Sequence, residues 1–96
     1  MFIVRDSFKA KPGMASKLAA LLKEVTSKQK DSKVRVLTDC VGPYNTVVME
    51  FEVPSLGEFE KRMQEYSEGK DKDMREKMKG YTDMYLTGGR EIYRVM

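Results

Sequence analysis

The sequence contains neither histidine nor tryptophan, and it has a single cysteine, Cys40. The absence of histidine excludes a Ser-His-Asp triad, a Cys-His pair, a histidine-ligated zinc ion and a haem with a proximal histidine. One cysteine supplies neither an intrachain disulfide nor a thiolate cage for zinc or an iron–sulfur cluster. We therefore expect no metal and no cofactor, and we expect Cys40 to be a small buried residue in a strand.

Long apolar runs are also missing. No segment approaches the roughly 18 apolar residues of a membrane span, and no charged start, apolar middle and small-residue cleavage site mark a secretory signal. With the lone cysteine, these absences predict a cytoplasmic protein that does not enter membranes. The 18 basic and 15 acidic residues leave a net charge of +3, which is typical of a well-solvated surface rather than of nucleic-acid binding.

What the sequence does contain is a pattern that occurs twice: an apolar strand runs into a proline, and an amphipathic helix follows. The strand and helix of each copy are predicted over residues 2–8 and 14–28, and over 46–53 and 56–68. Further strands are predicted over 34–41 and 90–95, the last one after a second helical stretch that ends at Gly88-Gly89. The order β-α-β-β-α-β predicts one α+β domain over 1–96, with a ferredoxin-like four-stranded antiparallel sheet and helices on one face.

The other face of this sheet is left without helices. Strand alternation places Ile3, Arg5, Val48, Glu50 and Glu52 on it. This mixture is apolar enough to need a cover, and arginine and glutamate can pair across a two-fold axis. We therefore predict a homodimer through the open sheet faces and leave a higher oligomer open. RNA-recognition domains of the same topology carry stacking aromatics where Glu50 and Glu52 stand, which argues against nucleic-acid binding.

A carboxylate among apolar residues is the feature that points to chemistry. Asp6 shares its strand face with Val4 and Phe8, and this face is expected to meet the helices. A carboxylate there is costly unless it is paired or hydrogen-bonded. Two interpretations are open: Asp6 is a catalytic acid or base in a pocket between sheet and helices, or it is structural and bonds to backbone or to an arginine.

Tyrosines recur in the second helical region. Phe59, Met63 and Tyr66 form one helical stripe, and Tyr81 and Tyr85 lie on the next. This spacing is typical of helices that cover a sheet, so core packing is one interpretation. The other is that the three tyrosines line the pocket of Asp6 and orient a substrate.

Two local motifs connect this pattern with a known superfamily. Lys11-Pro12-Gly13 precedes the first helix, and Gly42-Pro43-Tyr44-Asn45-Thr46-Val47-Val48 enters the third strand. Over essentially its whole length the chain resembles the dimeric α/β-barrel superfamily, and in particular its NIPSNAP-like members. The resemblance implies ferredoxin-like subunits that pack sheet against sheet. It leaves the activity open, because the superfamily includes cofactor-free monooxygenases, haem-degrading enzymes, isomerases and stress proteins.

The residues that the superfamily uses for haem degradation are not retained. That branch has an asparagine on the first strand, a tryptophan on the third and a histidine in the second helical region. The resemblance puts Asp6 at the first position and the second near Phe51, and there is no histidine, so haem degradation is disfavoured.

Two functions stay open. The first is a small-molecule-binding protein or cofactor-free enzyme, monooxygenase- or isomerase-like, with a pocket between sheet and helices. The second is a non-catalytic homo-oligomeric structural or stress protein. A cavity of about 300 Å³ or more, with Asp6 or a tyrosine hydroxyl facing in, favours the first. A helix-side core filled solid by methionine and phenylalanine favours the second.

Overall fold

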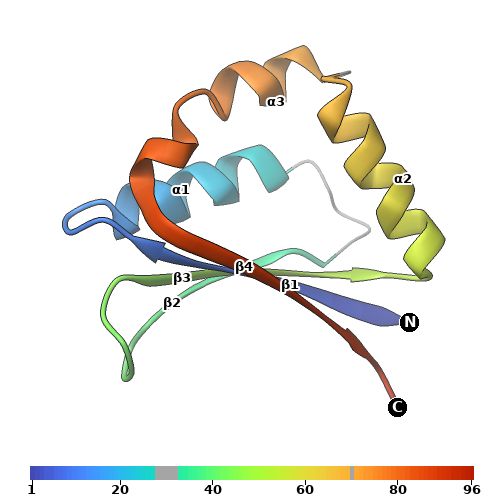
Figure 1. Cartoon of the computed structure of the whole chain (residues 1–96), viewed down its shortest axis with the longest axis horizontal. Coiled ribbons are helices and arrows are strands. Elements are labelled where there is room, and N and C mark those ends of the chain that lie inside the picture. Colours follow the sequence, from blue (N-terminus) through green and yellow to red (C-terminus); the bar gives the residue numbers. More distant parts are fainter. Residues whose placement is uncertain (28–32, 70) are drawn as a thin grey trace.

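A four-stranded antiparallel sheet lies under three helices in the computed structural model of the chain, which describes residues 1–27, 33–69 and 71–96 (Figure 1). The strands run in the order β2-β3-β1-β4. In chain order the elements are β1 (Phe2–Ala10), α1 (Ala15–Thr26), β2 (Arg35–Thr38), β3 (Thr46–Val53), α2 (Leu56–Ser67), α3 (Lys72–Lys77), the 3-10 helix η2 (Tyr81–Met84) and β4 (Tyr85–Arg94). All helices lie on one face, so the predicted α+β ferredoxin-like fold with one open sheet face is confirmed.

The helix α1 turns one apolar stripe toward the sheet. Leu18, Leu22 and Val25 recur at helical spacing and are buried, because this spacing keeps them on one side of the helix. The prediction over 14–28 starts one residue before α1, and Lys28 lies outside the described residues. In the described part of the chain, no helix combines the length and the apolar character that crossing a bilayer requires.

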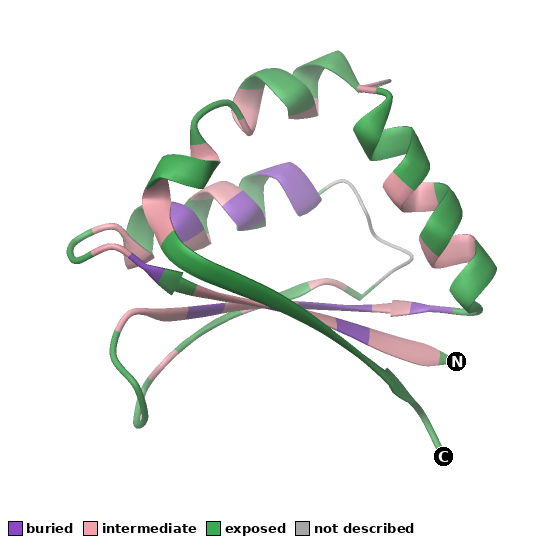
Figure 2. Ribbon diagram, viewed as in Figure 1, coloured by how far each residue is buried: buried purple, intermediate pink, exposed green. Residues whose placement is uncertain are grey.

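The apolar core is divided in two along the sheet. Figure 2 shows the buried residues gathered on α1, β1 and β3. One cluster contains Ala10, Leu18, Leu22 and Val47, and the other contains Val4, Phe51 and Val53. Between them, Asp6 on β1 stands opposite Met49 on β3. A carboxylate at this level of the central strand interrupts the apolar floor.

The helix α2 contacts the sheet mainly near its start. Ser55 caps it as predicted, since its Oγ accepts a hydrogen bond from the backbone N–H of Glu58 at 3.1 Å. Core packing, one interpretation of the stripe of Phe59, Met63 and Tyr66, does not hold for Tyr66, because no residue of α2 is buried and Tyr66 is 44% exposed. Phe59 packs against the second core cluster. Beyond it α2 rises away from the sheet and α3 returns toward it, so the two helices form an arch (Figure 1).

The strand β4 begins five residues before its predicted start. Tyr85 is its first residue rather than the end of a helix, and Gly88-Gly89 lies inside it. A Cβ at Gly88 would lie 3.2 Å from Cδ1 of Phe8 on the neighbouring strand. Glycine here lets the ring of Phe8 pack closely against β4, so the prediction fails because it treats the glycine pair as a break.

The strand β2 is shorter than the predicted 34–41. The strand ends at Thr38, and in the next residue, Asp39, the side chain rather than the backbone accepts a hydrogen bond from β3: its Oδ1 accepts the N–H of Thr46 at 2.9 Å. Cys40 therefore lies beyond β2 and is exposed, and the prediction of a buried strand cysteine is wrong.

A row of alternating charges crosses the open face. Arg35, Glu50, Arg5 and Glu91 are direct neighbours on the four strands. Glu50 is only 6% exposed and accepts hydrogen bonds from Nε of Arg5 at 2.9 Å and Nη2 of Arg35 at 2.5 Å. The hydroxyl of Tyr93 donates to Glu91 at 2.6 Å. Arginine–glutamate pairing, which the sequence predicts across a two-fold axis, is thus formed for Glu50 within one chain.

Replacing Glu50 with glutamine should lower the stability of the fold in a pH-dependent way. The hydrogen bond from Arg35, and next the one from Arg5, hold the pKa of Glu50 below its ordinary value of 4.5 against the opposing effect of burial. A lowered folded-state pKa contributes stability that is present above 4.5 and is lost as the pH falls through the folded pKa. We expect Glu50→Gln to lose about 1–3 kcal/mol at pH 7 and progressively less at acid pH.

Thermal unfolding of both proteins, at pH values stepped down from neutral through 4.5, measures this difference. Glu60→Gln, at an exposed position of α2, is the matched control and should change the melting temperature little. A loss for Glu50→Gln that stays constant over the whole series would contradict the assignment of the ion pairs.

Candidate functional site

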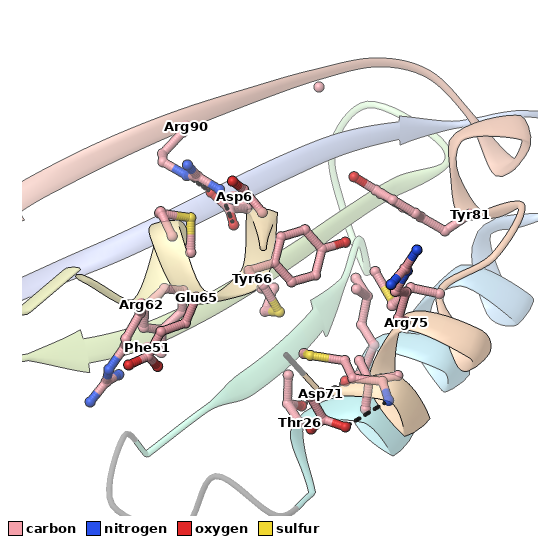
Figure 3. Close-up of a pocket in the computed structure, with 18 of the residues that line it drawn as sticks. Asp6, Thr26, Phe51, Arg62, Glu65, Tyr66, Asp71, Arg75, Tyr81 and Arg90 are labelled. Carbon is pink, nitrogen blue, oxygen red and sulfur yellow. Dashed lines mark hydrogen bonds and ion pairs between the residues drawn. The ribbon is translucent and has the colours of Figure 1, made fainter. Parts of the chain in front are cut away.

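The arch of α2 and α3 spans a cavity of about 980 Å³ over the sheet. Side chains of β1, β3 and β4 form its floor, those of α2 and α3 its roof, and those of the C-terminal half of α1 one wall (Figure 3). The apolar part of the lining consists of Phe8, Leu22, Val25, Met49, Phe51, Met63, Met74 and Met78. This volume lies at the upper end of the range of roughly 300–1,000 Å³ that is usual for small-molecule sites.

The cavity exists because the arch is packed only where its two ends reach the sheet and α1. Phe59 joins one core cluster, and Met78 and Met84 join the other. Nζ of Lys77 adds an ion pair to Glu24 of α1 at 3.3 Å. Between these two ends the helices leave the middle of the floor uncovered, at the level where the core is divided.

An ion pair between Asp6 and Arg90 occupies that part of the floor. The two residues are opposite each other on β1 and β4. Nε of Arg90 donates to Oδ1 of Asp6 at 2.6 Å, and Nη2 donates to Oδ2 at 3.3 Å (Figure 3). The hydrogen bond to Asp6 raises the pKa of the Arg90 guanidinium above its ordinary value. The Asp6 side chain is almost completely buried, whereas that of Arg90 is 43% exposed.

Asp6 therefore has the arginine partner that one interpretation of the sequence predicts, and it lines a cavity as the other requires. The same guanidinium lies over the ring of Phe59, with Cζ 5.1 Å from the ring centroid. Stacking and pairing together hold Arg90 in one orientation. A catalytic role of Asp6 stays a prediction.

Three tyrosines lie along the same cavity. Tyr66 comes from α2, Tyr81 from η2 and Tyr85 from the start of β4. The ring centroids of Tyr81 and Tyr85 are 5.8 Å apart, and those of Tyr85 and Phe8 are 4.9 Å apart. Burial, and next the phenol of Tyr66, raise the pKa of Tyr81; burial and then Tyr81 raise that of Tyr85. Both phenols thus stay protonated at neutral pH and can donate hydrogen bonds.

The four site residues predicted from the sequence, Asp6, Tyr66, Tyr81 and Tyr85, are brought together around one cavity. Their role in substrate binding stays a prediction. Sequence reasoning missed Arg90, although a buried Asp6 is a signal that a cation must lie nearby. Which cation depends on the register of β4 against β1, and that register was obscured by the glycine pair. Among the described residues, no three acidic or cysteine side chains gather in a way that could hold a metal ion.

No model of a protein family matches the sequence, and no curated protein does so either.

Solved structures, in contrast, match nearly the whole chain. A NIPSNAP family protein from Agrobacterium tumefaciens superimposes with a TM-score of 0.83 at 11% identity, covering 99% of this chain and 85% of that one. An uncharacterised NIPSNAP domain protein from Burkholderia xenovorans gives a TM-score of 0.77 at 10% identity, covering 100% and 95%. A candidate antibiotic biosynthesis monooxygenase from Deinococcus radiodurans gives 0.68 at 13% identity, covering 100% and 93%.

At these identities the likeness concerns the fold alone. The resemblance to NIPSNAP-like proteins that the sequence predicts is confirmed at this level. The chain has the ferredoxin-like fold that NIPSNAP family proteins share with the Deinococcus protein.

Proposed function

We propose that this chain is a small-molecule-binding protein whose ligand occupies the cavity under the arch of α2 and α3. The observation that carries the proposal is the cavity itself, about 980 Å³ in volume. Apolar side chains line it together with the Asp6–Arg90 pair, three phenols and charged side chains on and next to α2 and α3. Apolar surface with polar groups that can orient a ligand is typical of ligand sites. Methionines of α2 and α3 line this space rather than fill it, which disfavours a purely structural role. A cytoplasmic location remains part of the proposal.

The same cavity supports a cofactor-free enzyme of the monooxygenase or isomerase type, with Asp6 as its acid or base. Similarity in fold to the candidate monooxygenase from Deinococcus radiodurans favours this version. Both carboxylate oxygens of Asp6 accept hydrogen bonds from Arg90. A substrate oxygen would have to take over donors of Arg90 before Asp6 could accept a proton.

We also propose that the chain forms a homodimer through the open sheet faces. Leu37 and Tyr93 on this face are 40% and 44% exposed, and a chain of this length gains stability from covering such residues. Read in the opposite direction, the row of alternating charges has the opposite sign at each position. A two-fold axis parallel to the strands would therefore place each positive side chain of one copy opposite a negative side chain of the other. The alternative function, a homo-oligomeric structural or stress protein, requires this dimer but not the cavity.

Filling the cavity should abolish ligand binding without unfolding the chain. The neutral fluorophore N-phenyl-1-naphthylamine, which becomes bright in apolar sites, is a suitable probe. We expect saturable binding to the wild type and an affinity lower by about tenfold or more in Met74→Trp, because the indole occupies part of the space. The chain has no tryptophan of its own, so indole fluorescence also reports whether the variant is folded.

Leu56→Trp is the matched control for this experiment. Leu56 is 50% exposed and does not line the cavity, so this variant should keep the wild-type affinity. Failure of the wild type to bind the probe, or equal losses in both variants, would refute binding in the cavity.

A charge at the centre of the open face should dissociate the homodimer. In Val48→Asp, each copy would bury an unpaired carboxylate in the interface, and we expect the dissociation constant to rise about 100-fold or more. Light scattering at micromolar concentration measures the change in mass. Val41→Asp places the same charge on a side chain that is 96% exposed and should leave the dimer intact. A monomeric wild type under these conditions would disprove the dimer.

A further inference from the structure

The guanidinium of Arg90 has N–H groups that are not hydrogen-bonded to Asp6. It carries five N–H groups, and Asp6 accepts from Nε and from Nη2. In the described part of the chain, no other residue accepts a hydrogen bond from it. Since Arg90 lines the cavity and lies against the ring of Phe59 at 5.1 Å, its remaining N–H groups are available to a ligand without any change in side-chain orientation.

The charge of Arg90, however, is already compensated. Asp6 is 6% exposed and its Oδ1 lies 2.6 Å from Nε of Arg90. A second carboxylate at Arg90 would be repelled by the charge of Asp6 from a few ångströms away. The described lining residues include three guanidinium groups and four carboxylates, so they provide no positive excess for an anion.

A second donor faces the same space. Figure 3 shows the hydroxyl of Tyr81 directed across the cavity toward the Asp6–Arg90 pair. Arg90 and Tyr81 both line the cavity, so a ligand that lies between them faces both donors. The apolar side chains of Met49, Phe51 and Met78 line other parts of the same cavity.

We propose that the cavity selects an uncharged apolar ligand with a carbonyl-type oxygen, held by Arg90 and Tyr81, over the corresponding carboxylate. A neutral acceptor accepts hydrogen bonds from the unused N–H groups and is not repelled by Asp6. An anion accepts the same hydrogen bonds, but its repulsion by Asp6 cancels their contribution to the binding free energy. In this arrangement Arg90 and Tyr81 contact the ligand, and Asp6 is a positioning residue. The inference rests on the proposed function of the cavity.

Three naphthalene probes of similar size test this selectivity: 2-acetylnaphthalene, a neutral ketone; 2-naphthoate, an anion at pH 7; and 2-ethylnaphthalene, which lacks oxygen. Equilibrium dialysis gives their dissociation constants with the wild-type chain. We expect the ketone to bind about tenfold more tightly than either of the others, which is the effect of one hydrogen bond to a charged group.

Two substitutions separate the roles of the residues. Asp6→Asn leaves the charge of Arg90 uncompensated, so the preference should reverse and naphthoate should bind more tightly than the ketone. Tyr81→Phe should lower the affinity for the ketone about three- to tenfold and leave the affinity for ethylnaphthalene unchanged. Tyr44→Phe, at a side chain 82% exposed on the β2–β3 connection, is the matched control and should change no affinity.

Each outcome bears on a different claim. Naphthoate or ethylnaphthalene binding the wild type as tightly as the ketone would overturn the inference and leave ligand binding in place. No binding of any probe would overturn both. An unchanged order of affinities in folded Asp6→Asn would remove the electrostatic explanation. If that variant does not fold, the order of the three affinities for the wild type, together with the affinities for Tyr81→Phe, tests the inference.

Discussion

The ion pair between Asp6 and Arg90 is the interaction on which the helix-covered side of this protein depends. An almost completely buried carboxylate in the middle of the central strand needs a cation, and β4 supplies it from the position directly opposite. Along the strands, buried apolar side chains form one cluster on each side of this level, and Met49 packs against both. The arch of α2 and α3 reaches from one cluster to the other and leaves the cavity between them.

The inner strand β1 places a positive side chain on one face of the sheet and a negative side chain on the other. Arg5 and Asp6 are consecutive, so alternation sends Arg5 to the open face and Asp6 under the helices. Each then pairs with a neighbouring strand: Arg5 with Glu50 of β3, and Asp6 with Arg90 of β4. The two faces of the sheet therefore differ in the charge that β1 gives them. The open side has a row of alternating charges, and the covered side has an ion pair in the floor of the cavity.

The accuracy of the sequence predictions follows the strength of the local signals. The strand Thr46–Val53 and the start of α2 after Ser55 are as predicted, because strict alternation and a capping serine act within a few residues. The start of β4 is wrong, because Gly88 serves a contact with Phe8 from a distant part of the chain. The sequence left open whether Tyr66 packs in the core or lines a pocket for a related reason: a helical stripe shows which side of α2 is apolar, but not how far α2 stands from the sheet.

Local patterns in the sequence predict the order of the elements, the helix-covered and open faces, and the position of Asp6 where a carboxylate is costly. These follow from periodicities of two and 3.6 residues and from the chemistry of single side chains. The three-dimensional structure was needed to show that Arg90 is the partner of Asp6 and that Tyr66, Tyr81 and Tyr85 border a cavity. Strand register and helix-to-sheet distance depend on contacts between residues far apart in the chain, and no local pattern records them.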